Sequence, residues 1–130
     1  MLITPATFKY LFILDELMEE ESIFLNSMGD SPQMRIMQYM IEGRNFDYTL
    51  TDMLNAGVSW GTLNNLIPKL VRFGIISKTR KIGRATLYKI NENNLVSKKL
   101  IELYDQLIMR KLDDLEAEEI VAVRSLSADT

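Results

Sequence analysis

The fold is decided by residues 49–90, which read TLTDMLNAGVSWGTLNNLIPKLVRFGIISKTRKIGRATLYKI. Thr49 and Asp52 form a Thr-x-x-Asp capping box, which predicts the start of a short helix. Gly57 breaks this helix a few residues later, and Ser59 is suited to cap a second one. Two short helices joined by a tight turn that contains glycine make a helix-turn-helix.

The second helix of this pair, residues 59–73, is predicted to have one buried face and one exposed face. Its apolar residues recur at i, i+3, i+4 and i+7, which indicates a single side turned to the core. They are Leu63, Leu66, Ile67 and Leu70. The opposite face holds amides and cations but no carboxylate. Its members are Gly61, Asn64, Asn65, Pro68, Lys69 and Arg72. The proline inside the helix predicts a kink.

A β-hairpin is predicted directly after this helix. Gly74 is expected to end the helix in the left-handed conformation. Residues 75–80 and 85–90 have strand-like composition, and residues 81–84 between them are interpreted as the turn. A hairpin that follows a helix-turn-helix is a wing. The predicted fold class is therefore mainly α with a small β-hairpin wing, a winged helix-turn-helix.

Two flanking segments are predicted to be helical, residues 1–29 before the winged helix-turn-helix (residues 30–91) and residues 92–130 after it. We expect Asn91 to cap the C-terminal helix and the tail to fray from Ser125. Both helices carry more apolar surface than the central unit needs, which predicts a homodimer formed through them. The alternative is that both helices fold back on the winged-helix unit of their own chain. In the C-terminal helix the apolar stripe comprises Leu95, Val96, Leu100, Leu103, Tyr104, Leu107, Ile108, Leu112 and Leu115.

Charge is unevenly distributed along the chain. Residues 53–91 contain no Asp or Glu but 7 of the 15 basic residues, and all 18 acidic residues lie elsewhere. A cationic segment in a protein of net charge -3 is typical of a nucleic-acid surface, because each Lys or Arg near a phosphate releases condensed counterions. Double-stranded DNA is therefore the expected partner. The cations are Lys69, Arg72, Lys78, Arg80, Lys81, Arg84 and Lys89.

Composition excludes several classes of function. The 130 residues, 47% of them hydrophobic, suit one domain with a sizeable core. The absence of both Cys and His excludes thiolate and imidazole catalysis, zinc fingers and Cys/His metal sensors. Composition leaves carboxylate-only Mg²⁺ or Ca²⁺ sites open, but we expect no enzyme, no metal site and no cofactor. No apolar run is long enough for a bilayer and no signal peptide is expected, which favours a cytoplasmic protein that does not bind membranes.

The sequence resembles the winged-helix transcriptional regulators of the PadR, MarR and ArsR kind, especially their small archaeal members. The likeness covers residues 30–91 and rests on the order and spacing of several short motifs. These motifs are Thr49-Leu50-Thr51-Asp52, Gly57-Val58-Ser59, Gly61-Thr62-Leu63, Pro68-Lys69-Leu70, Phe73-Gly74-Ile75-Ile76, Gly83-Arg84 and Leu87-Tyr88-Lys89-Ile90.

This resemblance implies that the helix over residues 59–73 enters the major groove and that the wing, residues 75–90, follows the backbone or a minor groove. It also implies that the flanking helices form a homodimer. Asn64 stands where PadR-like proteins usually have an aromatic residue. The Cys and His ligands of ArsR-like metal sensors are absent, and no particular small-molecule effector is indicated.

Asn64 and Asn65 are the best candidates for reading bases, because a carboxamide can accept from adenine N6 and donate to adenine N7. The alternative is a pair of solvated surface amides. We favour DNA contact for Asn64 and leave both interpretations open for Asn65. Trp60 is interpreted as a partly buried packing residue between the two short helices, with donation from its indole N–H to a phosphate as the alternative.

Lys81 and Arg84, close to Arg80 at the turn of the wing, are predicted to contact phosphates or the minor groove, although most surface cations are simply solvated. Lys69 and Arg72 are expected to anchor the DNA backbone. The full set of predicted DNA-binding residues is Ser59, Trp60, Gly61, Thr62, Asn64, Asn65, Pro68, Lys69, Arg72, Lys78, Arg80, Lys81 and Arg84.

The function predicted from these features is sequence-specific binding of double-stranded DNA by a homodimer that acts as a transcriptional regulator, at a site expected to be palindromic. A partition or origin-binding protein of a plasmid or virus would use the same surface. The alternative from another class is a winged-helix protein–protein interaction module. An acidic recognition face would have favoured that alternative.

Overall fold

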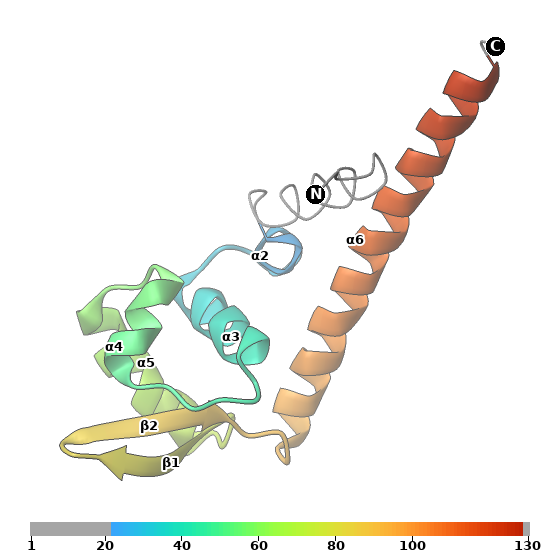
Figure 1. Ribbon diagram of the computed structural model, residues 1–130. Coiled ribbons are helices and arrows are strands. Elements are labelled where there is room, and N and C mark those ends of the chain that lie inside the picture. The colour runs from blue at the N-terminus through green and yellow to red at the C-terminus, as the bar shows by residue number, and fades with distance from the viewer. Residues whose placement is uncertain (1–21, 129–130) are drawn as a thin grey trace, which may run out of the picture.

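The computed structural model describes residues 22–128, so the predicted N-terminal helix lies mostly outside the described residues. The elements are α2 (Ile23–Met28), α3 (Pro32–Glu42), α4 (Leu50–Met53), η1 (Leu54–Ala56), α5 (Trp60–Arg72), β1 (Ile76–Ile82), β2 (Ala85–Ile90) and α6 (Leu95–Ala128). Figure 1 shows α3 to β2 gathered into one body, with α6 running along it and then beyond it. The mainly helical fold with one antiparallel hairpin confirms the predicted fold class.

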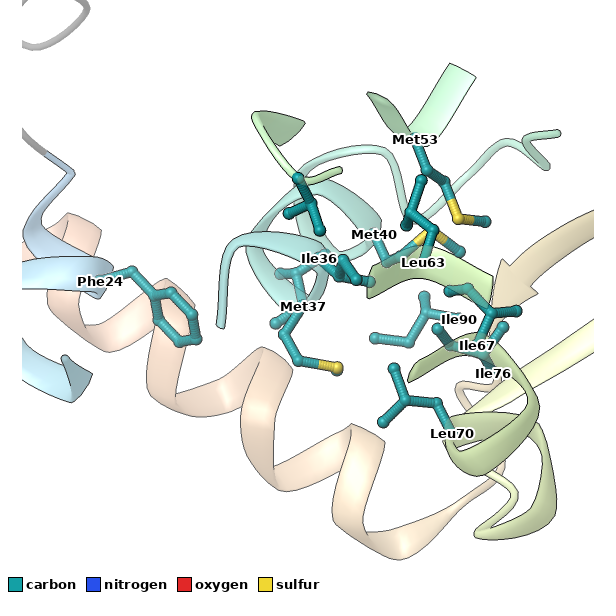
Figure 2. Close-up of a cluster of buried hydrophobic side chains, with 12 residues drawn as sticks. Phe24, Ile36, Met37, Met40, Met53, Leu63, Ile67, Leu70, Ile76 and Ile90 are labelled. Carbon is teal, nitrogen blue, oxygen red and sulfur yellow. The ribbon is translucent and has the colours of Figure 1, made fainter. Parts of the chain in front are cut away.

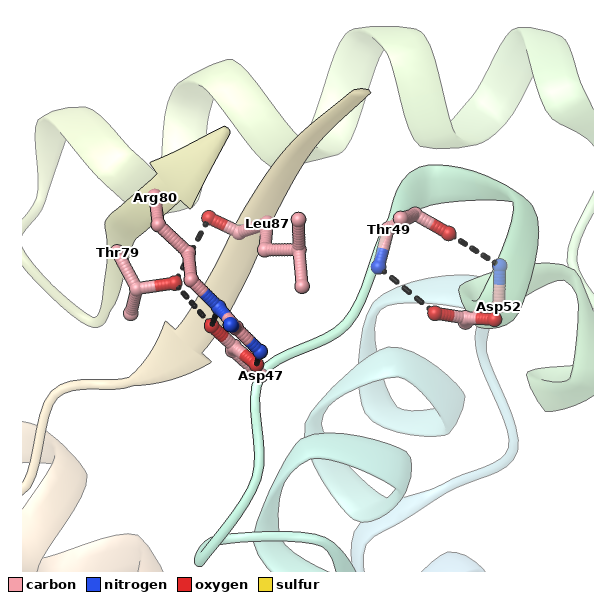
Figure 3. Close-up of polar contacts among 6 residues, drawn as sticks. All are labelled: Asp47, Thr49, Asp52, Thr79, Arg80 and Leu87. Atoms are coloured by element: carbon pink, nitrogen blue, oxygen red, sulfur yellow. Dashed lines mark hydrogen bonds and ion pairs between the residues drawn. The ribbon is translucent and has the colours of Figure 1, made fainter. Parts of the chain in front are cut away.

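Local sequence signals set the helix starts. Ser31 caps α3 by accepting from the Met34 N–H. In the capping box of α4, the Asp52 N–H donates to Thr49 Oγ1 at 3.1 Å and the Thr49 N–H donates to Asp52 Oδ2 at 2.9 Å (Figure 3). Ser59 caps α5 through the Thr62 N–H. The starts of α4 and α5 were predicted, because a cap depends on residues three positions apart.

The core lies between α3, α5 and the wing, as Figure 2 shows. The predicted inner face of α5 is confirmed, since Leu63, Ile67 and Leu70 are at most 2% exposed, while Leu66 is half-buried. The other fully buried side chains of this cluster are Phe24, Ile36, Met37, Met40, Ile41, Met53, Ile76 and Ile90. This packing fixes the orientation of α5, so its opposite face must point to solvent.

The wing is longer and its turn tighter than predicted. β1 continues through Lys81 to Ile82, and Ile82 pairs with Ala85, so only two residues form the turn. Gly83, the first of them, has φ +60°, a conformation that glycine adopts without strain in tight hairpin turns. The pairing skips Thr79, because Lys78 lies opposite Tyr88 and Arg80 lies opposite Leu87. This irregularity is a β-bulge, which bends a strand and changes its twist.

The link between α3 and α4 consists mainly of turns. Tyr48 forms an isolated β-bridge, in which its N–H and C=O exchange hydrogen bonds with Tyr88 of β2 at 2.7 and 2.8 Å. The Tyr48 ring lies edge-on to Tyr39, with ring centroids 5.0 Å apart, and directly against Gly43, where any side chain would overlap it. The link therefore attaches the wing to α3.

Helix α6 differs from its prediction at its start and in what its apolar stripe contacts. Asn94, and not Asn91, caps it by accepting from the N–H groups of Val96 and Ser97. Asn91 instead donates to the Gly74 carbonyl at the base of the wing. The helix continues to Ala128. Much of its apolar stripe packs against the core of the same chain. These core-contacting residues are Leu100, Leu103, Tyr104 and Leu107, together with Ile101.

Candidate nucleic-acid interface

The outward face of α5 is open to solvent along its length. Thr62, which is half-buried, is the exception among the residues predicted to bind DNA on this helix. The exposed ones are Ser59, Trp60, Gly61, Asn64, Asn65, Pro68, Lys69 and Arg72. The helix is continuous through Pro68. No carboxylate within residues 22–128 forms an ion pair with Lys69 or Arg72, so both charges are available to a ligand.

The N-terminal turn of α5 presents polar groups and one large aromatic ring. Ser59 Oγ accepts from the Thr62 N–H at 3.3 Å and lies 2.8 Å from Thr62 Oγ1, so the two hydroxyls are hydrogen bonded. Trp60 is 49% exposed, more than expected for a packing residue between two helices. A Cβ added to Gly61 would have no neighbour within 4 Å. This end of the helix is thus sterically accessible to a ligand as large as a duplex.

The outer part of the wing carries cations on exposed backbone. Every residue from Lys78 to Ala85 is exposed. Arg84 lies in the two-residue turn itself, and Lys81 lies in β1 opposite Thr86. Neither cation has an ion-pair partner within residues 22–128. The tip of the wing can therefore present both charges to an anionic surface.

Arg80 is in a different situation, because its guanidinium is bound to Asp47 in the link before α4. Arg80 Nε donates to Asp47 Oδ2 at 2.9 Å, and Arg80 Nη2 donates to Asp47 Oδ1 at 3.2 Å (Figure 3). Thr79 Oγ1 also donates to Asp47 Oδ2, at 2.6 Å. The hydrogen bonds from Arg80 and then from Thr79 lower the pKa of Asp47 from 3.8 to about 2. The carboxylate is therefore ionised at neutral pH.

Asp47 and Thr79 are site residues that sequence reasoning missed. Residues 53–91 contain no Asp or Glu. Asp47 precedes this segment in sequence, but the fold places its carboxylate against Arg80 of the wing. The only signal was its position directly before Tyr48, and strand pairing of Tyr48 with the wing was not predicted. The acid-free segment is thus not acid-free in space.

A second ion pair joins the same link to α6. Arg44 Nη1 and Nη2 donate to the two carboxylate oxygens of Asp105 at 3.0 and 2.6 Å. This contact lowers the pKa of Asp105. At the preceding residue of α6, the Tyr104 hydroxyl donates to Glu42 Oε1 at 3.0 Å, and burial with the nearby Glu42 charge raises the pKa of Tyr104. The link is therefore held to α6 at one end and to the wing at the other.

Residues 22–128 contain no group of three or more Asp and Glu side chains arranged to hold a metal ion. None of the helices in that range is long and apolar enough to cross a membrane.

Comparison with known proteins identifies the fold. No protein-family model and no curated protein matches the sequence. The structure is similar to that of NadR in complex with 4-hydroxyphenylacetate, with 18% sequence identity, a TM-score of 0.54, and coverage of 98% of this chain and 92% of that chain. It is also similar to MepR, a transcription regulator of the Staphylococcus aureus multidrug efflux pump MepA, with 12% identity, a TM-score of 0.52, and coverage of 98% and 100%. An S. aureus MepR mutant bound to an oligodeoxyribonucleotide gives 17% identity, a TM-score of 0.54, and coverage of 98% and 100%. These likenesses confirm the winged-helix fold that the sequence predicted.

Proposed function

We propose that this protein is a transcriptional regulator, without enzymatic activity, that binds double-stranded DNA as a homodimer. Helix α5 enters the major groove, where Asn64 reads a base edge and Lys69 and Arg72 bind phosphates. The wing lies on the adjacent backbone or minor groove, with Lys81 and Arg84 as its contacts. The remaining interface residues are Ser59, Trp60, Gly61, Thr62, Asn65, Pro68 and Lys78.

The observation that carries this proposal is the exposed face of α5, which has amides and cations but no carboxylate. Phosphate contacts supply much of the affinity for DNA, and carboxamides recognise adenine in the major groove. The fold adds support, because it is shared with a MepR mutant bound to an oligodeoxyribonucleotide. A protein-binding module needs no such concentration of unpaired cations.

The C-terminal half of α6 supports the homodimer. Met109, Ile120 and Leu126 are 54%, 52% and 70% exposed, and at about 100° per residue they lie within a third of the helix circumference. This stripe, which also includes Glu116 and Glu119, lies beyond Leu107, the last residue of α6 that packs on the core cluster. Pairing two such stripes across a two-fold axis removes them from water and sets the spacing of the two α5 helices at about 34 Å, one turn of DNA.

Selection of bound sequences from random duplex DNA, followed by footprinting, tests the proposed function. We expect a palindromic site with two protected major grooves on one side of the duplex. Recovery of no preferred sequence, with protection spread along the DNA, would contradict sequence-specific regulation. If copies of the selected sequence cluster in a plasmid or viral origin, the partition or origin-binding role would be favoured instead.

Light scattering tests the dimer. The chain is expected to give about twice its mass of 15.0 kDa, and Ile120→Glu is expected to reduce this to the monomer mass by placing a charge in the apolar stripe. Val121→Glu is the matched control, because Val121 is 64% exposed but lies outside the stripe. A monomeric wild-type chain, or equal effects of both substitutions, would contradict a dimer interface formed by this stripe of α6.

A further inference from the structure

The wing is held near its base by a carboxylate from outside the hairpin. The Asp47 side chain is 16% exposed, whereas that of Arg80 is 62% exposed. Two guanidinium nitrogens of Arg80 bind the two oxygens of Asp47, and Thr79 Oγ1 binds one of them (Figure 3). A two-point pair of this kind is directional as well as strong. It therefore fixes where the Arg80 side chain points.

These contacts fall on the β-bulge of the wing. Thr79 is the residue that the pairing of β1 with β2 skips, and its hydroxyl lies within hydrogen-bond distance of both Asp47 and the Leu87 carbonyl, at 2.6 and 3.3 Å. A bulge bends the strand and redirects the residues beyond it. Contact between Asp47 and the bulge therefore sets the angle at which Lys81 and Arg84 project from the body.

The same contacts oppose binding of a phosphate by Arg80. If Arg80 moved to a phosphate, Asp47 would keep a mostly buried negative charge without its strongest partner. That charge would also repel the DNA backbone close to the wing. Lys81 and Arg84 lie beyond the bulge and have no competing carboxylate within residues 22–128. Of these three wing cations, only Arg80 would therefore have to break an ion pair in order to bind a phosphate.

We propose that Asp47 is a positioning residue for the wing and that Arg80 remains bound to Asp47 in the DNA complex and makes no phosphate contact. This inference rests on the proposed DNA binding. It divides the cations of the hairpin by role. Arg80 orients the wing, and Lys81 and Arg84 contact the DNA.

The salt dependence of duplex binding distinguishes these roles, because each lost phosphate contact reduces the slope of log K against log salt by about 0.9. The double variant Asp47→Asn with Arg80→Gln removes the ion pair without changing the net charge. We expect its slope to equal that of the wild type. Arg84→Ala, the control on the same hairpin, should reduce the slope by about 0.9. Circular dichroism verifies that each variant is folded.

A footprint provides the second measurement. In the double variant, protection of the DNA flanking the α5 contacts should shift along the duplex while protection under α5 stays in place, because Lys81 and Arg84 still contact phosphates from a wing that has lost its fixed orientation. A slope reduced by about 0.9 in the double variant, or an unchanged flanking footprint, would overturn the role of Asp47 and leave the proposed function standing. Absence of salt-dependent binding by the wild-type chain would overturn both.

Discussion

Helix α5 and the wing form the two halves of the proposed interface, and their cations have different surroundings. Along α5, Lys69 and Arg72 are exposed and have no ion-pair partner within residues 22–128. On the wing, Arg80 is bound by Asp47 from the preceding link, whereas Lys81 and Arg84 are not paired within that range. Helix α5 is oriented by its buried face, and the wing is oriented by attachments at its base.

This difference shows how a charged segment should be interpreted. Seven cations in an acid-free segment of sequence indicate where a polyanion can bind, but they do not show which cations are available. Availability depends on the residues that the fold brings near each cation. Two attachments, Tyr48 on Tyr88 and Asp47 on Arg80, join parts of the chain that are far apart in sequence. The predictions below separate the two halves of the interface.

The largest expected effect is on the support of the wing. In Gly43→Ala the new methyl group would overlap the Tyr48 ring, so we expect a loss of about 1–3 kcal/mol in the free energy of unfolding. Displacement of Tyr48 should also loosen its pairing with Tyr88. The measurement is urea denaturation, with amide hydrogen exchange at Tyr88 as a local probe. Gly61→Ala is the control, because its methyl group has open space around it and alanine favours a helix by about 0.5–1 kcal/mol.

Base reading by α5 is tested by Asn64→Ala. Loss of a two-point contact to adenine should cost about 1–3 kcal/mol of binding free energy on the selected site and leave binding to random DNA nearly unchanged. Asn93→Ala, an exposed amide before α6, should affect neither. Equal weakening on selected and random DNA would show that Asn64 does not read sequence.

Most of the structure around α5 could be predicted from the sequence. The caps at Thr49 and Ser59, the inner face with Leu63 and Leu70, and the left-handed Gly74 follow from signals within a few residues of each other. These features also place the outward face correctly.

The wing half was only partly predictable, because its geometry depends on distant contacts. Composition predicted a four-residue turn over residues 81–84. Pairing of Ile82 with Ala85 shortens the turn to two residues. The bulge at Thr79 and its contact with Asp47 have no local sequence signature. The same holds for α6, where the first half of the apolar stripe covers the core of its own chain. A stripe in sequence does not show which surface it will cover.

A smaller effect is expected from the tip of the wing. The double variant Lys81→Ala with Arg84→Ala should reduce the magnitude of the salt slope by about 2 and weaken selected and random DNA alike. Lys98→Ala, an exposed cation on α6, should leave the slope unchanged. Preferential weakening on sites with narrow A·T minor grooves would show that Arg84 reads groove shape.

The smallest expected effect is on stability in acid. The pKa of Asp47 is lowered from 3.8 to about 2 in the folded protein, so its hydrogen bonds stabilise the fold above the unfolded pKa. That stabilisation is lost as the pH falls through the folded pKa. The melting temperature of Asp47→Asn should therefore fall less steeply between about pH 4 and pH 2 than that of the wild type. Asp113→Asn, an exposed carboxylate on α6, is the control, and identical profiles for Asp47→Asn and the wild type would contradict the assignment.

The salt dependence of duplex binding by the wild-type chain tests the central claim most directly. If the five cations of the proposed interface, which are Lys69, Arg72, Lys78, Lys81 and Arg84, each neutralise about one phosphate, log K should fall against log salt with a slope of about −4.5. Titrations between about 50 and 200 mM salt cover the range in which this loss is large. Binding with that slope is the predicted result. Binding that does not change with salt, or no binding at low salt, would contradict a DNA interface on α5 and the wing.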